Sequence, residues 1–290
     1  MTMARPLTRN DDERAVLARL ATGISYEVMP FPSTVGTVRA HVPTEVPLTV
    51  TATGGKGLEP TIATSIALRQ AGYTVAPHLA ARLITGPEEL DQILTRLEAG
   101  GVDRLFVIAG DAGQPAGVFT EALDVLRALQ DRTHLFKDLG IGGYPEGHAG
   151  LSDEQVRQAM RDKAPYAHRI LTQICFDADA FLRWGAQLRT DGVELPVYAG
   201  MPGPVSRQKL MRISASLGLG QSANFLKKQR TMLWRFFSPA GYSPDGLVRG
   251  LVRGLPESRA HIAGFHLFTF NEIAATEAWR RRLLAEAGLG

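Results

Sequence analysis

The sequence predicts a (β/α)8 TIM barrel formed by one domain, residues 1–290, with a helical insertion between strands seven and eight. Eight short apolar segments alternate with helical ones, and most have no polar face, which is typical of parallel strands covered by helices. Eight strands favour a closed barrel over an open doubly wound sheet. The length of 290 residues also suits a single-domain α/β barrel.

The composition is that of a soluble globular protein, with 44% hydrophobic and 21% charged residues. The net charge is +3 and basic residues are dispersed except at Arg280–Arg282, which argues against nucleic acid and allows an anionic small-molecule partner. Cys175 is alone, so internal disulfides and thiolate metal clusters are excluded. Met1–Arg19 has no signal-peptide core and no segment is as long as a membrane span, so we expect a cytoplasmic protein. A homo-oligomer is compatible with this composition.

The predicted elements follow the change of hydrophobic period along the chain. The strands are Gly23–Pro32 (stopped by its prolines), Val46–Ala52, Tyr73–His78, Asp103–Ala109, Leu139–Gly143, Arg169–Ile174, Glu194–Ala199 and His261–Phe268. The helices are Asn10–Thr22, Glu59–Ala71, one ending at Ala99, Gly117–Gln130, one after Ser152, Asp177–Thr190 and Asn271–Ala287. Capping boxes are expected at Thr85–Glu88 and Ser152–Gln155. The crossover Ser33–Glu45 is only weakly helical.

The segment Met201–Ala260 is longer than a barrel crossover requires. It predicts two or three helices in which basic and aromatic residues are interleaved: Arg207, Lys209, Arg212, Phe225, Lys227, Lys228, Arg230, Trp234, Arg235, Phe236 and Phe237. The favoured interpretation is an extra helical layer with a solvated basic face. The alternative is a lid over the barrel mouth that attracts an anionic substrate tail.

Polar residues stand where the predicted strands end, and in this fold that end carries the active site. They are Glu27, Thr51, His78, Asp111, the turn Tyr144–His148, Gln173, Thr269 and Asn271. Glu27 has mostly apolar neighbours in sequence, so it requires either a fixed partner or a shifted pKa that serves a reaction. The set contains acids, an amide and histidines, but no nucleophile paired with a base.

Two other interpretations of these motifs are weaker. His78, His148, Glu27 and Asp111 could hold a divalent cation, but no local ligand spacing supports such a site. His266 is interpreted as a buried structural histidine of the last strand. Gly218–Ala223 superficially matches a dinucleotide-binding turn, but it follows a helix and is interpreted as a helix–helix connection.

Taken together, these strand ends resemble the methylenetetrahydrofolate reductase family. The matching pieces occur in the family's order: Ser25–Glu27 with Pro30, Val50–Thr51, Ala76–Leu79, Gly110–Asp111, Gly143–His148, Leu171–Ala178 and Gly264–Asn271. The resemblance implies a reductase that converts 5,10-methylenetetrahydrofolate into 5-methyltetrahydrofolate. It implies that Glu27 is the general acid, that Asp111 holds the pterin and stabilises the developing cation, and that Gln173 binds the pterin edge. Phe176, Met201 and Gln208 are the further residues that we expect to bind the substrate.

The departures from the family pattern concern the flavin. Members that carry FAD have an arginine before the Gly-Asp pair, where this chain has Ala109, and an aromatic residue where it has Ala52. Lys163 aligns with a phosphate-binding lysine only across a one-residue gap. Each lost charge-assisted ligand removes about 1.5–3 kcal/mol. We therefore expect FAD to be absent and NADH or NADPH, with NADH slightly favoured, to transfer hydride directly.

In this hypothesis the nicotinamide dinucleotide occupies the place of the flavin. Its expected contacts are Thr51, His78, Gly110, Tyr144, His148 and Lys163. Two alternatives remain: an FAD-dependent ping-pong reductase of the same family, and a non-catalytic folate-binding or methyl-carrier partner protein.

Overall fold

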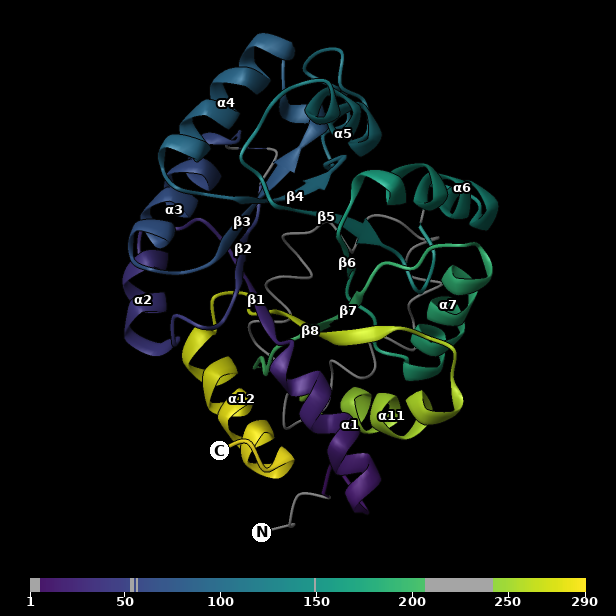
Figure 1. Cartoon of the computed structure of the whole chain (residues 1–290). Helices are drawn as coiled ribbons and strands as arrows, with labels where there is room; N and C mark the ends of the chain where they lie inside the picture. Colours follow the sequence, from purple (N-terminus) through teal and green to yellow (C-terminus); the bar gives the residue numbers. More distant parts are fainter. Residues whose placement is uncertain (1–5, 53–54, 56, 149, 207–241) are drawn as a thin grey trace.

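Eight parallel strands close into one barrel and follow each other in sequence order (Figure 1). The computed structural model describes residues 6–52, 55, 57–148, 150–206 and 242–290. The strands are β1 Ser25–Val28, β2 Leu48–Val50, β3 Val75–Ala80, β4 Arg104–Ile108, β5 Asp138–Gly143, β6 Arg169–Thr172, β7 Val197–Pro202 and β8 Ile262–Phe268. Pairing of β1 with β8 closes the ring. The (β/α)8 prediction is confirmed.

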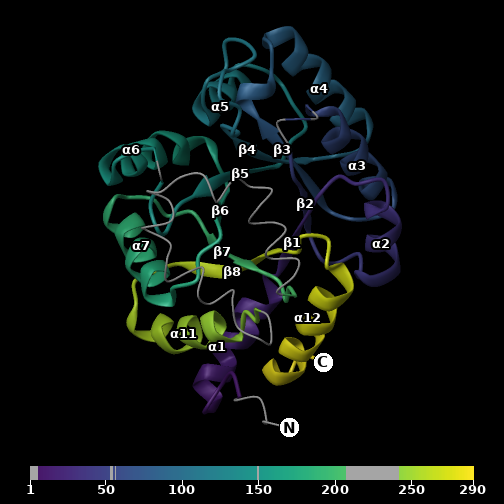
Figure 2. The same ribbon diagram turned by 180° about the vertical axis from the view of Figure 1, so that it is seen from behind.

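Helices form the outer layer around this ring, as the views from both sides show (Figures 1 and 2). The described α-helices are α1 Asp11–Thr22, α2 Thr34–His41, α3 Glu59–Gln70, α4 Pro87–Ala99, α5 Ala122–Gln130, α6 Asp153–Lys163, α7 Ala178–Thr190, α11 Asp245–Gly254 and α12 Ile273–Ala287. Short 3-10 turns occur at Ala81–Leu83, Ala164–Tyr166 and Leu255–Glu257. Within the described residues, no helix is long and apolar enough to cross a membrane.

The α5 helix begins five residues later than the sequence predicts, at Ala122 instead of Gly117. Glu121 and Asp124 form a capping box there, and the Asp124 carboxylate also accepts hydrogen bonds from the backbone and hydroxyl of Thr120. These side-chain acceptors satisfy the free N–H groups of a helix start, which fixes the boundary. The weakly helical crossover does contain a helix, α2.

The two predicted capping boxes have different outcomes. Ser152 and Gln155 bond each other's backbone N–H as expected, at 3.3 and 2.8 Å. Thr85, by contrast, donates its N–H and hydroxyl to Glu89 instead of pairing with Glu88, at 2.6 Å each. The start of α4 is therefore held one residue further along the chain than the motif suggests.

The long segment before β8 is described only in part. β7 extends through Met201 and Pro202, so the insertion begins later than the sequence predicts. The helix α11 lies in its second half and packs with α7. The predicted basic and aromatic residues between positions 207 and 237, the glycine turn at 218–223 and Gln208 lie outside the described residues.

The strands divide their side chains between two environments, because successive residues of a strand point to opposite faces. Outward residues such as Tyr26, Val28 and Leu267 belong to the main hydrophobic core between barrel and helices. A smaller apolar cluster of Ala76, Phe106 and Leu171 stands apart from that core. Strand positions on the same side as this cluster also carry the polar residues Glu27, His78 and His266, whereas barrels are usually filled with branched apolar residues.

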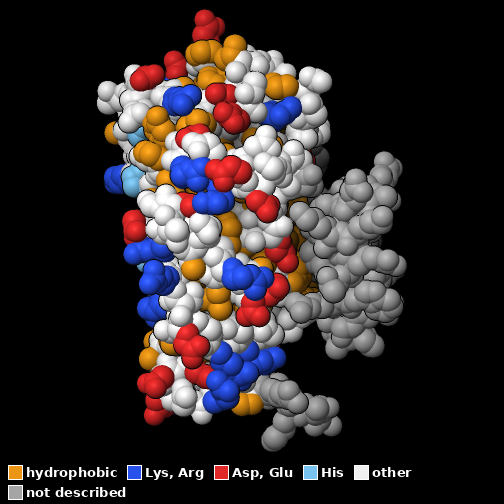
Figure 3. All heavy atoms as spheres, turned by 90° about the vertical axis from the view of Figure 1, so that its right-hand side faces the viewer, with side chains coloured by type: hydrophobic (Ala, Val, Ile, Leu, Met, Phe, Trp, Pro, Cys, Tyr) orange, Lys and Arg blue, Asp and Glu red, His pale blue; other side chains and the backbone are white. Residues whose placement is uncertain are grey.

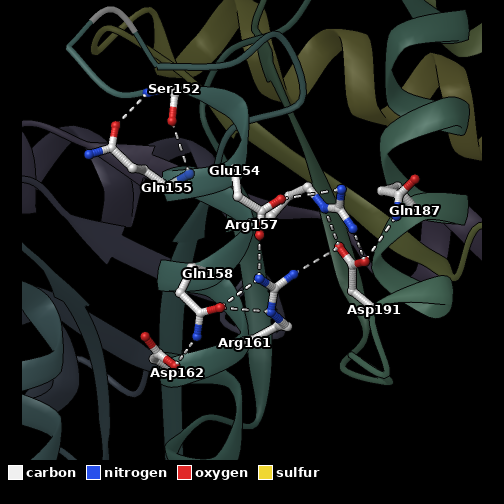
Figure 4. Close-up of polar contacts among 9 residues, drawn as sticks. All are labelled: Ser152, Glu154, Gln155, Arg157, Gln158, Arg161, Asp162, Gln187 and Asp191. Atoms are coloured by element: carbon white, nitrogen blue, oxygen red, sulfur yellow. Dashed lines mark hydrogen bonds and ion pairs between the residues drawn. The ribbon is translucent and has the colours of Figure 1, made fainter.

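Charged side chains link helices and strand ends on the outside of the barrel. Figure 4 shows Arg157 and Arg161 of α6 directed at Asp191, which follows α7. Arg157 binds that carboxylate with two nitrogens, at 2.9 and 2.5 Å. Figure 3 shows acidic and basic side chains interspersed over much of the face of the molecule that it displays.

Candidate active site at the carboxyl ends of the strands

The side chain of Glu27 lies inside the barrel and touches two histidines. Its Oε2 atom is 3.4 Å from Nε2 of His78 on β3 and 3.6 Å from Nε2 of His266 on β8. Only 13% of the Glu27 side chain is exposed. Burial raises the pKa of Glu27 to about 7, and the opposing effect of His78 is smaller. The carboxyl group can therefore hold and release a proton near neutral pH.

Both histidines are neutral at that pH. Burial lowers the pKa of His78 to about 4, against a smaller opposing effect of Glu27. Burial, reinforced by the positive charge of Arg169, lowers the pKa of His266 to about 3. Because both neighbouring histidines are neutral, and no described Lys or Arg pairs with Glu27, its carboxylate gains little stabilisation and the protonated acid is favoured.

His266 has a hydrogen-bonding environment of its own. Its Nδ1 lies 2.8 Å from the Ser25 hydroxyl, and its Nε2 lies 3.5 Å from the Thr49 hydroxyl. The sequence-based interpretation of a buried, satisfied histidine holds, since only 1% of the residue is exposed. That interpretation missed the contact with Glu27, which depends on the register that pairs Ser25 with His266.

Near this end of the barrel, two buried polar atoms form no hydrogen bond with described residues, and one glycine has few described neighbours. Among the described residues, the buried Thr51 hydroxyl has no hydrogen-bond partner, and the buried His78 Nε2 has only its 3.4 Å contact with Glu27, which lacks hydrogen-bond geometry. A Cβ added at Gly142 of β5 would meet only the Tyr144 hydroxyl, at 3.8 Å. Buried polar atoms are normally satisfied, so the first two are suited to a polar ligand.

The predicted Gly110–Asp111 pair follows β4 after one intervening residue, Ala109. Gly110 has a φ of 87°, a left-handed conformation that favours glycine. Asp111 is exposed and comes after this turn. The left-handed backbone conformation therefore explains why glycine occupies position 110. The turn places Asp111 at the same end of the barrel as Glu27.

The turn after β5 brings Tyr144 and His148 together. Gly147 has a φ of 80° and donates its N–H to the Tyr144 carbonyl at 3.0 Å. The two rings meet edge to face, with centroids 5.0 Å apart. Burial raises the pKa of the Tyr144 hydroxyl, which therefore stays protonated and able to donate a hydrogen bond.

Lys163 is directed into the fold. Its Nζ donates to the Gly142 carbonyl at 3.4 Å. Burial lowers the pKa of Lys163 to about 8, with Glu121 acting in the opposite sense. A phosphate contact by this lysine would compete with the bond to Gly142.

The predicted substrate-binding residues occupy different environments. Gln173 is exposed after β6, and its side-chain oxygen accepts the N–H of Ile174 at 2.9 Å. Phe176 is 6% exposed and packs edge to face on Tyr242. Met201 has no exposed surface and belongs to the main core between barrel and helices, so it does not border the mouth.

The four residues weighed as a metal site are not gathered into one. Glu27 and His78 are in contact, whereas His148 packs on Tyr144 and Asp111 is exposed. Among the described residues there is no group of three or more His, Cys, Asp or Glu side chains arranged to hold a metal ion.

The profile of the methylenetetrahydrofolate reductase family matches residues 28–222. The chain belongs to this family. The matched region begins one residue after Glu27 and ends before β8. The profile therefore does not cover Glu27 or His266, and their place in the site rests on the contacts described above.

The relatives with this name differ in how much of their length is matched. The 5,10-methylenetetrahydrofolate reductase of Escherichia coli is 24% identical over 231 residues, which cover 75% of this chain and 73% of that protein. Methylenetetrahydrofolate reductase 2 of Saccharomyces cerevisiae is 25% identical over 123 residues, 39% of this chain and only 20% of the yeast protein. The chain thus matches about a fifth of the larger eukaryotic relatives.

Among solved structures, a protein from Clostridium thermocellum that binds two copies of 5-methyl-5,6,7,8-tetrahydrofolic acid is similar in fold. Its TM-score is 0.62 at 14% identity, and the alignment covers 93% of this chain and 98% of that one. An oxaloacetate acetylhydrolase aligns with a TM-score of 0.52 at 13% identity. At these identities the likeness concerns the barrel alone.

Proposed function

We propose that this protein reduces 5,10-methylenetetrahydrofolate to 5-methyltetrahydrofolate, with Glu27 as the general acid and NADH or NADPH as the direct hydride donor. The observation that carries the proposal is a buried carboxyl group with a pKa of about 7, flanked by two neutral imidazoles, in a chain of this family. An acid whose pKa lies near the working pH is suited to proton donation.

The proton is needed to make the bridging carbon an electrophile. Glu27 protonates N10 of the folate, the bond from N10 to the bridging carbon breaks, and an iminium forms at N5. A bound NADH or NADPH supplies the hydride that this carbon accepts. One proton and one hydride are consumed for each methyl group formed, so Glu27 must regain a proton from solvent before the next turnover.

In this proposal, Asp111 and Gln173 bind the folate substrate. Both follow strands at the same end of the barrel as Glu27, and both are exposed to an incoming ligand. The Asp111 carboxylate stabilises the positive charge of the iminium. The Gln173 amide bonds the pterin edge and keeps the reacting carbon in line with the donor.

The described residues fit a nicotinamide donor at the mouth. The Thr51 hydroxyl, which has no hydrogen-bond partner among the described residues, offers a polar contact. The described atom nearest to a Cβ added at Gly142 is the Tyr144 hydroxyl, at 3.8 Å, and His148 packs on the Tyr144 ring. These groups would hold and orient the donor.

The same residues fit FAD less well. Ala109 stands where a phosphate-binding arginine is expected, and its carbonyl accepts the N–H of Arg82. The Arg82 side chain is itself engaged with the Gly113 carbonyl at 3.0 Å, and Lys163 with that of Gly142. Within the described residues, these two cations are each bonded to a backbone carbonyl, and the arginine expected before the Gly-Asp pair is replaced by Ala109. The loss of that arginine, which the resemblance assigns to the flavin, supports direct transfer over a flavin relay.

A catalytically silent folate-binding or methyl-carrier protein is the competing function. Folate recognition alone does not require a buried acid with a pKa near 7, whereas reduction does.

The test is an absorbance spectrum of the purified protein followed by an assay without added flavin. We expect no flavin absorbance, and oxidation of NADH or NADPH that depends on 5,10-methylenetetrahydrofolate. A stoichiometric flavin would replace direct transfer by the ping-pong reductase. Tight folate binding without any reduction would favour the carrier protein.

A further inference from the structure

The chain leaves β8 through two consecutive residues in the left-handed region. Phe270 has a φ of 48° and Asn271 a φ of 58°, and neither is glycine. They are the only described non-glycine residues with positive φ. Such conformations are costly for ordinary residues and persist where surrounding contacts enforce them, often beside functional sites.

The contacts of Asn271 lie on the segment that follows Glu27. Its side-chain oxygen accepts the Met29 N–H at 2.8 Å, and its nitrogen donates to the Met29 carbonyl at 3.2 Å. The same nitrogen donates to the Thr34 hydroxyl at 2.9 Å. Thr34 in turn donates to the Met29 carbonyl at 2.6 Å. Met29 is thus held through both of its backbone polar groups.

The residue before this pair fixes Glu27 itself. The backbone N–H and the hydroxyl of Thr269 both donate to the Glu27 carbonyl, at 3.2 and 2.7 Å. The Thr269 hydroxyl also accepts the Asn271 N–H at 3.1 Å. Thr269 has no exposed surface, so water does not compete for these bonds.

We propose that Asn271 is a positioning residue for the reduction: with Thr269 and Thr34 it forms a clamp that fixes the backbone on the carboxyl side of Glu27 and so aims the carboxyl group at the substrate. The inference rests on the proposed function and adds a residue to it. The left-handed conformation at Phe270 and Asn271 is what turns the Asn271 amide back onto β1.

The clamp bonds only backbone atoms of Glu27 and Met29, whereas other residues surround the Glu27 carboxyl group. The titratable groups that face Glu27 are His78 on β3 and His266 on β8, and neither touches Asn271 in the described contacts. A change at Asn271 therefore alters where the acid lies without removing its neighbours.

The principal test is Asn271→Gly. Glycine adopts φ of 58° without strain, so the turn can persist while the amide is removed. We expect kcat to fall by about tenfold to a hundredfold with KM changed by less than about twofold, because displacement of a catalytic group by about 1 Å has effects of this size. We also expect the high-pH limb of the kcat profile to move to lower pH as Glu27 becomes better solvated.

Two threonines of α2 provide the matched comparison. Thr34→Val removes the hydroxyl that Asn271 and Met29 share, whereas Thr37→Val removes a hydroxyl that bonds only Ser33. Thr34→Val should lower kcat and should combine with Asn271→Gly less than additively, since both belong to one network. Thr37→Val should leave kcat unchanged.

Amide hydrogen exchange separates this inference from the proposed function. In Asn271→Gly the Met29 amide should exchange at least about tenfold faster, because its acceptor is gone, while amides of β4 keep their rates. Unchanged exchange at Met29, or full kcat with an unmoved pH profile in an active protein, would overturn the clamp. A wild-type protein that reduces no methylenetetrahydrofolate would overturn the proposed function, and the exchange result would still decide on the clamp.

Discussion

At the scale of single residues, the chemistry of the site depends on what surrounds the Glu27 carboxyl group. Few carboxyl groups in a folded protein are buried without a cationic partner. Here the neighbours are the neutral His78 and His266. Burial without a compensating charge is what brings the pKa of Glu27 to about 7.

Replacement of Glu27 by glutamine removes the proton and keeps the shape. We expect Glu27→Gln to bind folate about as well as the wild type and to lose turnover by about a hundredfold or more, the effect of one general acid. Steady-state kinetics and folate binding measure the two effects separately. Glu88→Gln, at an exposed carboxylate on α4, is the control and should retain full activity.

The pH dependence of turnover follows from the same group. In the proposed mechanism Glu27 acts in its protonated form, so kcat should fall as the pH rises through about 7, the pKa to which burial raises it. Activity that is constant from pH 6 to pH 9 would mean that another group supplies the proton.

Secondary-structure elements determine which side chains meet at this site. The β1–β8 seam, where the first and last strands pair, places Ser25 opposite His266. Glycines lie on both sides of this seam, Gly23 just before β1 and Gly264 in β8. A Cβ added at Gly264 would lie 2.1 Å from the Gly23 carbonyl oxygen. Close approach of the two backbones is therefore possible only without side chains at these positions.

Gly264→Ala tests the seam. The added methyl group meets backbone atoms that cannot turn aside, so we expect a loss of about 3 kcal/mol or more in the free energy of unfolding. Gly36→Ala is the matched control, since nothing lies within 4 Å of a Cβ there. It lies inside α2 and should stabilise the protein by up to about 1 kcal/mol. Denaturant unfolding compares both; equal stability of the two variants would contradict this account of the seam.

The strands could be predicted because each one is a short apolar segment, and Glu27 could be selected as a charge placed in such a segment. The register of β1 against β8 has no signature in the sequence, so the contact of His266 with Glu27 was missed. The burial of Met201 in the main core was not foreseen for a related reason: the sequence does not say which face of β7 points outward. The start of α5 depends on hydrogen bonds of Thr120, Glu121 and Asp124 that compete with a longer helix.

At the scale of the whole molecule, the barrel gathers residues from distant parts of the chain at one end. Glu27 lies near the carboxyl end of β1, Asp111 and Gln173 follow β4 and β6, and the turn Tyr144–His148 follows β5. Parallel strands place all of these at the same rim. The central claim of the proposed function is that a folate and a nicotinamide are held together at this rim without a flavin between them.

Transfer of deuterium from the C4 position of labelled NADH or NADPH, on the face that reacts, tests that claim most directly. In direct transfer the hydride never resides on an exchangeable atom, so the methyl group of 5-methyltetrahydrofolate should carry one deuterium per molecule in ordinary water. In a flavin relay the transferred hydrogen resides on a nitrogen and exchanges with solvent. A methyl group formed without label, from either face of the donor, would contradict the account.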